Sequence, residues 1–213
     1  MLLIFDLDDT LIPTSLKLTP RRLEMALRKM VAHGLPIEYE RGREILLGLN
    51  EKARHSKDVL EEFVLKMGGT IKHREIGLNV LEESLCGIEI EEEFWVNDFL
   101  RGLPYRKAIV TAGNSKVQEE KIDRFGIDRT LFEEIIVEEK GKKERSYSRL
   151  QEKFGKFLVV GDRILDDLSG AKKIGGITIH IRQGRGKIEP KGHPDVDYEI
   201  TTINELKGIL ERL

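Results

Sequence analysis

The feature that most constrains the fold is an apolar run at the start of the chain that ends in acidic residues. The run Leu2–Phe5 is followed by DLDDT, which spans Asp6 to Thr10. Four consecutive apolar residues predict a strand buried on both faces, and the acids fall where such a strand leaves its sheet. Asp6 and Asp8 share one side if the chain stays extended, and two carboxylates facing one small volume require a cation or hydrogen-bond donors. The sequence therefore predicts a metal-assisted acidic site, with an Asp-rich turn or helix start as the alternative.

The remaining chain separates into a helical block and an alternating block. Residues 14–100 carry helical apolar patterns and almost no strand signal, which predicts helices inserted after the first strand. From residue 101 short apolar segments alternate with helical ones, and the predicted strands are 107–111, 134–137, 157–161, 177–181 and 196–200. Such alternation favours an α/β fold, a doubly wound, Rossmann-like parallel sheet with helices on both faces.

Polar side chains gather where the predicted strands end, which is the edge of an open parallel sheet that binds ligands. The second strand leads into Thr111, Ala112, Gly113 and Asn114, the third into Lys140, Lys142 and Lys143, and the fourth into Asp162, Asp166 and Asp167. Ser115 and Gln118 have capping-box spacing for the helix after the second strand, and Asn114 is an alternative cap. The sequence thus predicts acids, a hydroxyl and a lysine at one edge.

This combination suits phosphoryl transfer. A carboxylate beside a divalent cation can attack phosphorus and form an aspartyl-phosphate. A lysine and the amides of a helix N-terminus can hold the phosphoryl oxygens, and a second carboxyl group can protonate the leaving oxygen. No His/Cys cluster is present, so carboxylate ligands favour Mg²⁺ over zinc.

Composition narrows the partners and the location. The 213 residues carry a net charge of -2, a single cysteine, and no apolar segment of membrane-spanning length. We therefore expect a cytoplasmic protein that binds neither nucleic acid nor membranes. Whether it is a monomer or a homodimer is left open.

The four segments, in this order, resemble the motifs of the haloacid dehalogenase superfamily. The resemblance covers residues 1–13 and 101–213 as an α/β catalytic core, and residues 14–100 as an inserted, all-helical cap domain. It implies Asp6 as nucleophile and metal ligand, and Asp8 as general acid–base with its carbonyl on the metal. It implies that Thr10 orients the loop and that the segment after the second strand binds the phosphoryl group through Thr111, Ala112, Gly113 and Asn114. It also implies a phosphate-binding lysine, for which Lys143 is preferred and Lys142 comes next. The further metal ligands that it implies are Asp162 and Asp167, with Asp167 preferred to its neighbour Asp166.

The resemblance also favours one reaction. Dehalogenases of the superfamily lack an acid two residues after the nucleophile, whereas this chain has Asp8. We therefore expect a Mg²⁺-dependent phosphatase whose partner is a small phosphorylated metabolite, a phosphomonoester that it hydrolyses. A phosphotransferase or phosphomutase using the same residues is the alternative, and a dehalogenase or a non-catalytic binding protein is less favoured.

Overall fold

The computed structural model describes residues 1–138 and 142–213. Contacts between residues divide the chain into two compact units, which we call the core unit (Met1–Pro13 with Glu89–Leu213) and the helical unit (Thr14–Ile88). The contact boundary lies at residue 88, before the predicted end of the cap at residue 100. The division into a catalytic domain and a cap with separate functions stays a prediction.

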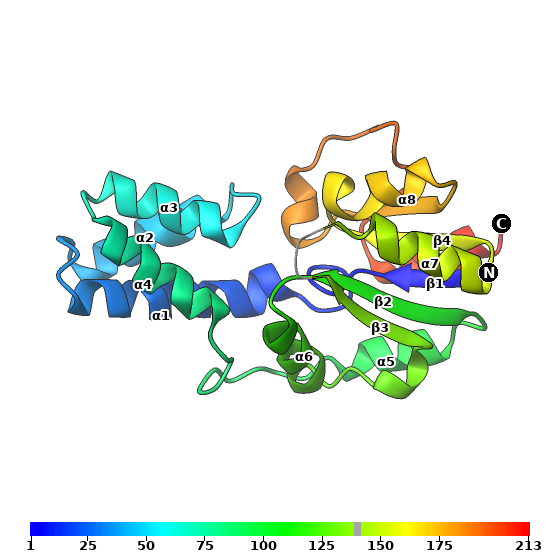
Figure 1. Ribbon diagram of the computed structural model, residues 1–213, viewed down its shortest axis with the longest axis horizontal. Helices are drawn as coiled ribbons and strands as arrows, with labels where there is room; N and C mark the ends of the chain where they lie inside the picture. Colours follow the sequence, from blue (N-terminus) through cyan, green and yellow to red (C-terminus); the bar gives the residue numbers. More distant parts are fainter. Residues whose placement is uncertain (139–141) are drawn as a thin grey trace. The chain divides into compact units, whose positions relative to one another are not determined.

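The core unit contains a parallel sheet that, among the described residues, has six strands (Figure 1). The strands are β1 (Leu2–Phe5), β2 (Arg106–Ala112), β3 (Glu134–Glu138), β4 (Phe157–Gly161), β5 (Ile177–Ile181) and β6 (Tyr198–Ile200). Their spatial order is β3-β2-β1-β4-β5-β6, so the first strand of the sequence lies in the middle. Phe5 is level with Ile109 of β2 and with Val160 of β4. The residues that follow β1, β2 and β4 therefore emerge side by side at the carboxyl edge of the sheet.

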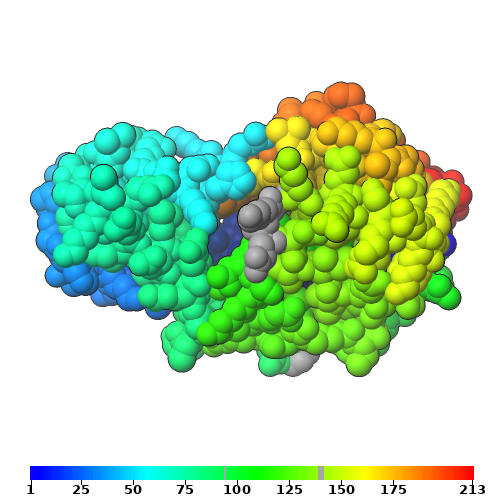
Figure 2. Space-filling model, viewed as in Figure 1, coloured from blue at the N-terminus to red at the C-terminus, as the bar shows by residue number. Residues whose placement is uncertain are grey.

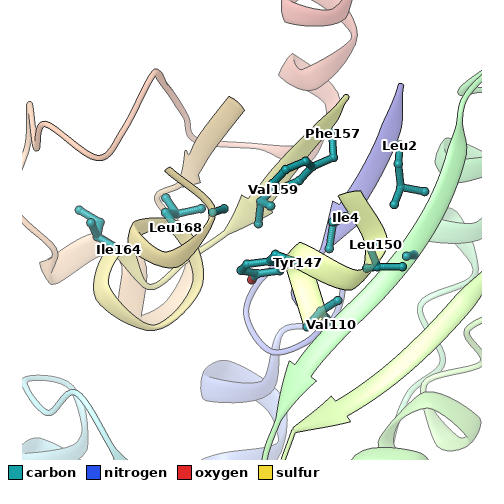
Figure 3. Packing of buried hydrophobic residues seen from close by; sticks show 11 residues of the cluster. Leu2, Ile4, Val110, Tyr147, Leu150, Phe157, Val159, Ile164 and Leu168 are labelled. Atoms are coloured by element: carbon teal, nitrogen blue, oxygen red, sulfur yellow. The ribbon is translucent and has the colours of Figure 1, made fainter. Parts of the chain in front are cut away.

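A hydrophobic core fills the space between one face of this sheet and helices α7 (Glu144–Phe154) and α8 (Ser169–Lys173) (Figure 3). Alternate strand residues point into it, among them Ile4, Val110 and Val159, and Tyr147 of α7 packs against them with 1% of its surface exposed. Side chains of this size contribute about 1.5–3 kcal/mol each when fully buried. Because β1, β2 and β4 contribute side chains to the same core, this packing helps to hold the ends of these three strands next to one another.

The remaining helices of the core unit are α5 (Phe94–Arg101), α6 (Ser115–Arg124) and α9 (Leu206–Leu210). In Figure 1, α5 and α6 lie on the face of the sheet opposite to α7. Helix α5 is joined to the segment after α6, because the Asn97 side chain donates to the Gly126 carbonyl at 2.7 Å and accepts from the Asp128 amide at 2.9 Å. These bonds explain why α5, predicted from the sequence as part of the inserted block, groups with the core unit.

In the space-filling view, the yellow-green atoms of α7 and the gold atoms of α8 lie on the right and upper parts of the visible face of the core unit, and green residues from earlier in the chain form its lower part (Figure 2). Consistent with this, β1 and β4 are buried along their whole length. A strand buried on both faces needs an apolar side chain at every position, which is the pattern that Leu2–Phe5 shows.

The helical unit contains α1 (Thr19–Ala32), α2 (Tyr39–Asn50), α3 (Ser56–Lys66) and α4 (Ile71–Glu82), preceded by a π-helical turn at Thr14–Leu18. Its own core includes Leu27, Leu60 and Phe63, all with 0% exposure. The buried Arg22 donates to the carbonyls of Val80 and Glu83 at 2.6 and 2.8 Å, which ties α1 to the end of α4. An arginine that satisfies two carbonyls at a helix C-terminus compensates for acceptors that lack intrahelical partners.

The predicted α/β class, the parallel sheet and the helical insertion after β1 are confirmed. The predicted strands Leu2–Phe5, 157–161 and 177–181 match β1, β4 and β5, and the other three differ by one or two residues at their ends. The segment after β4 forms a π-helical turn at Ile164–Leu168 followed by α8. Within the described residues, no helix is long and apolar enough to cross a membrane.

Candidate active site

Three carboxylates meet at the carboxyl edge of the sheet. Asp6 follows β1, Asp162 follows β4, and Asp167 lies in the π-helical turn after β4. Each offers one oxygen, and these oxygens all lie within 4.8 Å of one another. Their exposed fractions are 6%, 3% and 2%. The Asp6 amide donates to the Val160 carbonyl at 2.9 Å, which holds the chain beside β4 as it leaves β1.

Lys143, at the start of α7, supplies a positive charge inside this cluster. Its Nζ donates to Asp6 Oδ1 at 2.5 Å and to Asp167 Oδ1 at 2.7 Å, and only 3% of its side chain is exposed. Burial by itself lowers the pKa of Lys143, but the carboxylates of Asp167 and Asp6 raise it well above its usual value. The ammonium is therefore charged at neutral pH and joins β1 to the turn after β4.

One ammonium does not balance three buried carboxylates. Burial, together with the charges of Asp167 and Asp8, raises the pKa of Asp6 to about 7 against the opposing effect of Lys143. Burial, together with the charges of Asp167, Asp9 and Asp6, raises the pKa of Asp162 well above its usual range. Buried carboxylates whose oxygens converge need a further cation in order to ionise. Asp6, Asp162 and Asp167 together can thus hold a metal ion.

The adjacent acids Asp166 and Asp167 point in different directions. Asp167 Oδ2 accepts from the Arg163 amide at 2.9 Å while Oδ1 accepts from Lys143, so both oxygens lie inside the site. Asp166 is 47% exposed in its side chain and pairs with the Arg163 guanidinium at 3.0 Å. Gly161 makes room for Asp167, because a Cβ atom at position 161 would lie 2.5 Å from the Asp167 Cβ.

Of the lysines predicted for phosphate binding, the structure brings Lys143 to the acids. Lys142 is exposed, and Lys140 lies outside the described residues. The family resemblance implied Lys143 in preference to Lys142. The role of either lysine toward a phosphoryl group stays a prediction.

The segments after β1 and β2 form the rest of the edge. The Thr10 side chain is buried, and its hydroxyl has no hydrogen-bond partner among residues 1–138 and 142–213. Asp9 adopts a φ of 55° in the turn, and its Oδ2 accepts from the Arg185 amide at 3.4 Å. Ala112 is half-buried, and Gly113 has a φ of 145°, a conformation that favours glycine.

The cap of α6 differs from the capping box predicted for Ser115 and Gln118. Asn114 is the N-cap residue, and its side-chain oxygen accepts from the Val117 amide at 3.2 Å. Gln118 is 1% exposed, and its side chain points into the site. The Gln118 side chain donates hydrogen bonds to Asp8 and Thr111 and therefore does not cap the start of α6.

Two site residues were missed by sequence reasoning, Gln118 and Lys121 of α6. Lys121 Nζ lies 2.8 Å from each oxygen of Asp8, and Gln118 Nε2 lies 3.0 Å from Asp8 Oδ2. The sequence does carry a signal for them, because both are on the same side of the helix as the buried Val117 and Ile122. Polar residues on the apolar face of a helix need buried partners, and that requirement marks them as candidates.

The two adjacent acids provide a matched test of the metal site. We expect Asp167→Asn to weaken Mg²⁺ binding by about 10–100-fold, because it removes one of the three converging charges. Asp166→Asn is expected to change it less than about twofold, because an exposed ion pair contributes little. Isothermal titration of both variants with Mg²⁺ measures this. Equal weakening in the two variants would contradict the assignment of Asp167 to the site.

The fold and this acidic edge define a class of α/β proteins with a central parallel sheet, a helical segment inserted after the first strand and a buried aspartate cluster. No protein-family model matches the chain. Among solved structures, it resembles an HAD-hydrolase-like protein of Bacillus subtilis bound to magnesium, with a TM-score of 0.64 and 22% identity over 98% of this chain and 97% of that one. It also resembles an HAD phosphatase from Thermococcus onnurineus, with a TM-score of 0.60 and 24% identity over 98% and 96% of the two chains.

Sequence relatives narrow the class. A glyceraldehyde 3-phosphate phosphatase of Pyrococcus abyssi is 30% identical over 202 residues, which cover 86% of this chain and 82% of the relative. The enzyme of the same name from Pyrococcus furiosus is 26% identical over 99% of this chain and 92% of the relative. The chain belongs to the haloacid dehalogenase-like hydrolases, and within them to the phosphatases.

Proposed function

We propose that this phosphatase hydrolyses a small phosphomonoester through an aspartyl-phosphate on Asp6. The observation that carries the proposal is the contact of Asp6 with Lys143 inside the buried cluster that also contains Asp162 and Asp167. A nucleophilic carboxylate has to be ionised and surrounded by groups that can neutralise an incoming phosphoryl group. Lys143, together with a cation bound by the converging carboxylate oxygens, would supply the positive charge that both the Asp6 carboxylate and the phosphoryl group need.

The donor set fits Mg²⁺. All three ligand candidates are carboxylates, the oxygen ligands that Mg²⁺ prefers, and the chain's histidines and its single cysteine, Cys86, contribute nothing to the cluster. Asp6, Asp162 and Asp167 would hold the ion, with the backbone carbonyl of Asp8 as a further ligand. When bound, Mg²⁺ supplies positive charge to the phosphoryl oxygens and keeps Asp6 ionised.

The chain's own residues account for the proton and bond changes. A carboxylate oxygen of Asp6 attacks phosphorus, the bond from phosphorus to the ester oxygen breaks, and protonated Asp8 gives its proton to the leaving alkoxide. Water then attacks the phosphorus of the aspartyl-phosphate and passes a proton to Asp8. This step releases inorganic phosphate and restores both side chains. Lys143, Thr111 and the amides near Gly113 hold the phosphoryl oxygens during both steps.

The names of the sequence relatives support a substrate class. The curated relatives from Pyrococcus furiosus, Pyrococcus abyssi, Methanopyrus kandleri and Methanocaldococcus jannaschii are all glyceraldehyde 3-phosphate phosphatases. Three of these alignments cover 99% of this chain. We therefore infer that the substrate is a small phosphorylated sugar and that glyceraldehyde 3-phosphate is the first candidate.

The test is phosphate release from glyceraldehyde 3-phosphate, dihydroxyacetone phosphate, glycerol 3-phosphate, glucose 6-phosphate and p-nitrophenyl phosphate, each with Mg²⁺ and with EDTA. We expect EDTA to lower every rate by at least about 100-fold and added Mg²⁺ to restore it, because the cluster then lacks its cation. The highest kcat/KM is expected for glyceraldehyde 3-phosphate. Transfer of the phosphoryl group to a sugar acceptor in preference to water would favour the phosphotransferase alternative.

The pKa of Asp6 gives this proposal a pH dependence that needs no substrate. In the metal-free protein, Asp6 has a pKa of about 7, so it holds a proton at pH 5.5 and has lost most of it at pH 8. Mg²⁺ must displace that proton, and its apparent affinity is expected to rise between pH 5.5 and pH 8. The rise in unfolding temperature on addition of Mg²⁺ should therefore be larger at pH 8. An equal rise at both pH values would contradict this account of the cluster.

A further inference from the structure

The Asp8 carboxylate is held by two side chains of one helix. Lys121 Nζ is 2.8 Å from both Oδ1 and Oδ2, so the ammonium contacts both oxygens. Gln118 Nε2 donates to Oδ2 at 3.0 Å. The Asp8 side chain is 30% exposed, whereas that of Lys121 is 9% exposed. Asp8 thus faces solvent in part, while the groups that hold it lie in the interior.

Gln118 also joins Asp8 to the end of β2. Its amide nitrogen donates to Thr111 Oγ1 at 2.5 Å as well as to Asp8. A primary amide has two hydrogens and can serve both acceptors at once. Helix α6, which carries Gln118 and Lys121, is fixed at its start by the Asn114 cap and follows β2 directly. The orientation of Asp8 is therefore coupled to the strand end that carries Thr111.

We propose that Lys121 and Gln118 are positioning residues that fix the Asp8 carboxyl group for proton transfer to the leaving oxygen. This inference rests on the proposed function, in which Asp8 is the general acid. An aspartate side chain has two rotatable bonds, and a general acid must lie within about 2.6–3.2 Å of the atom it protonates. The two contacts from Lys121 fix the plane of the carboxyl group, and Gln118 fixes its distance from Thr111. Loss of either lets Asp8 rotate into the solvent that it already faces.

The effect of a substitution on substrates with different leaving groups distinguishes a positioning role from a purely structural one. An alkoxide such as that of glyceraldehyde leaves only if it is protonated, whereas p-nitrophenolate is stable enough to leave without a proton. The ratio kcat/KM covers binding and the formation of the aspartyl-phosphate, which is the step that contains the departure of this group. A fault in the placement of Asp8 therefore lowers kcat/KM for the alkyl phosphate much more than for the aryl phosphate.

The experiment compares Lys121→Met with the wild type on glyceraldehyde 3-phosphate and on p-nitrophenyl phosphate with saturating Mg²⁺. We expect kcat/KM for the alkyl phosphate to fall about 100-fold, within the range that a positioned general acid contributes. For the aryl phosphate we expect a fall of less than about threefold, because that reaction does not need the acid. Gln118→Leu is expected to show the same asymmetry with a smaller loss. Lys121→Arg, which keeps the positive charge, should retain most of the alkyl activity.

Lys116→Met is the matched control, since Lys116 is an exposed lysine on the same helix. This substitution should leave kcat/KM unchanged for both the alkyl and the aryl phosphate. Thermal unfolding of each variant separates misfolding from misplacement, and Lys121→Arg keeps the test valid if Lys121→Met does not fold. Equal losses on both substrates would overturn the inference, since a direct phosphate ligand or a structural residue behaves in that way. An increase in activity would also overturn it, because Lys121 would then be restraining Asp8.

The proposed function and this inference fail in distinguishable ways. If wild-type protein releases no phosphate from any alkyl or aryl phosphate with Mg²⁺, the proposed function fails and the inference falls with it. If the wild type is active on another alkyl phosphate but not on glyceraldehyde 3-phosphate, that ester replaces it in the comparison. If the wild type is active and Lys121→Met equals it on both substrates, only the inference fails.

Discussion

Replacement of Asp6 by asparagine is expected to abolish phosphatase activity and to leave the metal-free protein at least as stable as the wild type. An amide cannot attack phosphorus, so kcat should fall by about 10⁴-fold or more, as for other lost nucleophiles. Stability should move in the opposite direction, because the Asp6 carboxylate is buried among other acids and its pKa is raised to about 7. The two measurements are single-turnover phosphate release and thermal unfolding with EDTA.

The stability effect of Asp6→Asn has a predicted pH dependence. A carboxyl group whose folded pKa exceeds its unfolded value of 3.8 contributes stability at low pH and loses it as the pH rises through about 7. The variant lacks this titration, so its unfolding free energy relative to the wild type should increase from pH 5 to pH 8. Asp58→Asn, at an exposed aspartate of α3, is the control and should change neither property. If Asp6→Asn retains activity within tenfold of the wild type, Asp6 is not the nucleophile.

Replacement of Lys143 by methionine is expected to impair both folding and activity. The change leaves Asp6 and Asp167 buried without the ammonium that contacts both. Removal of one partner from a buried ion pair costs about 3 kcal/mol or more, so the metal-free variant should unfold at lower denaturant concentration by a corresponding amount. Mg²⁺ should restore part of the loss, because a cation among the same carboxylates replaces some of the missing positive charge. Chemical denaturation with and without Mg²⁺ measures both effects.

The activity of Lys143→Met should fall by about 10²–10³-fold at saturating Mg²⁺, since one donor to the transferring phosphoryl group is lost. Lys142→Met is the comparison, because Lys142 is the exposed neighbour that the sequence also offered for this role. We expect it to change unfolding and kcat little. If Lys142→Met has the larger effect on kcat, the assignment of Lys143 is wrong.

Much of the fold was predictable because the apolar segments are short, uninterrupted and separated by helical patterns. The run Leu2–Phe5 predicts a fully buried strand, and in the structure it is a central strand of the sheet. The placement of Asp6 and Asp162 followed, since the carboxyl ends of adjacent parallel strands share an edge. The end of the inserted block was harder to predict. Helix α5 has an apolar face like those of α1–α4, and only its bonds to residues near Gly126 assign it to the core unit.

The candidate site divides in the same way. The choice between Asp166 and Asp167 depended on which carboxylate turns inward, and that depends on the π-helical turn and on the space left by Gly161. Gln118 looked like half of a capping box, because local spacing favours a bond to the nearby backbone. In the folded protein, Thr111 and Asp8 are its partners, at sequence separations of 7 and 110 residues. A partner 110 residues away cannot be detected from a local sequence pattern.

The sequence alone determined the order of strands and helices, the acids at the ends of β1 and β4, and the family that these segments resemble. These features depend on local periodicity and on the rule that parallel strands end at a common edge. Tertiary structure alone decided which side chains touch: Lys143 between Asp6 and Asp167, and Lys121 against Asp8. The physical reason is that a buried charge needs an opposite charge beside it, and the packing of the chain decides which residue supplies that charge. Packing can bring together residues that are more than a hundred positions apart in the sequence.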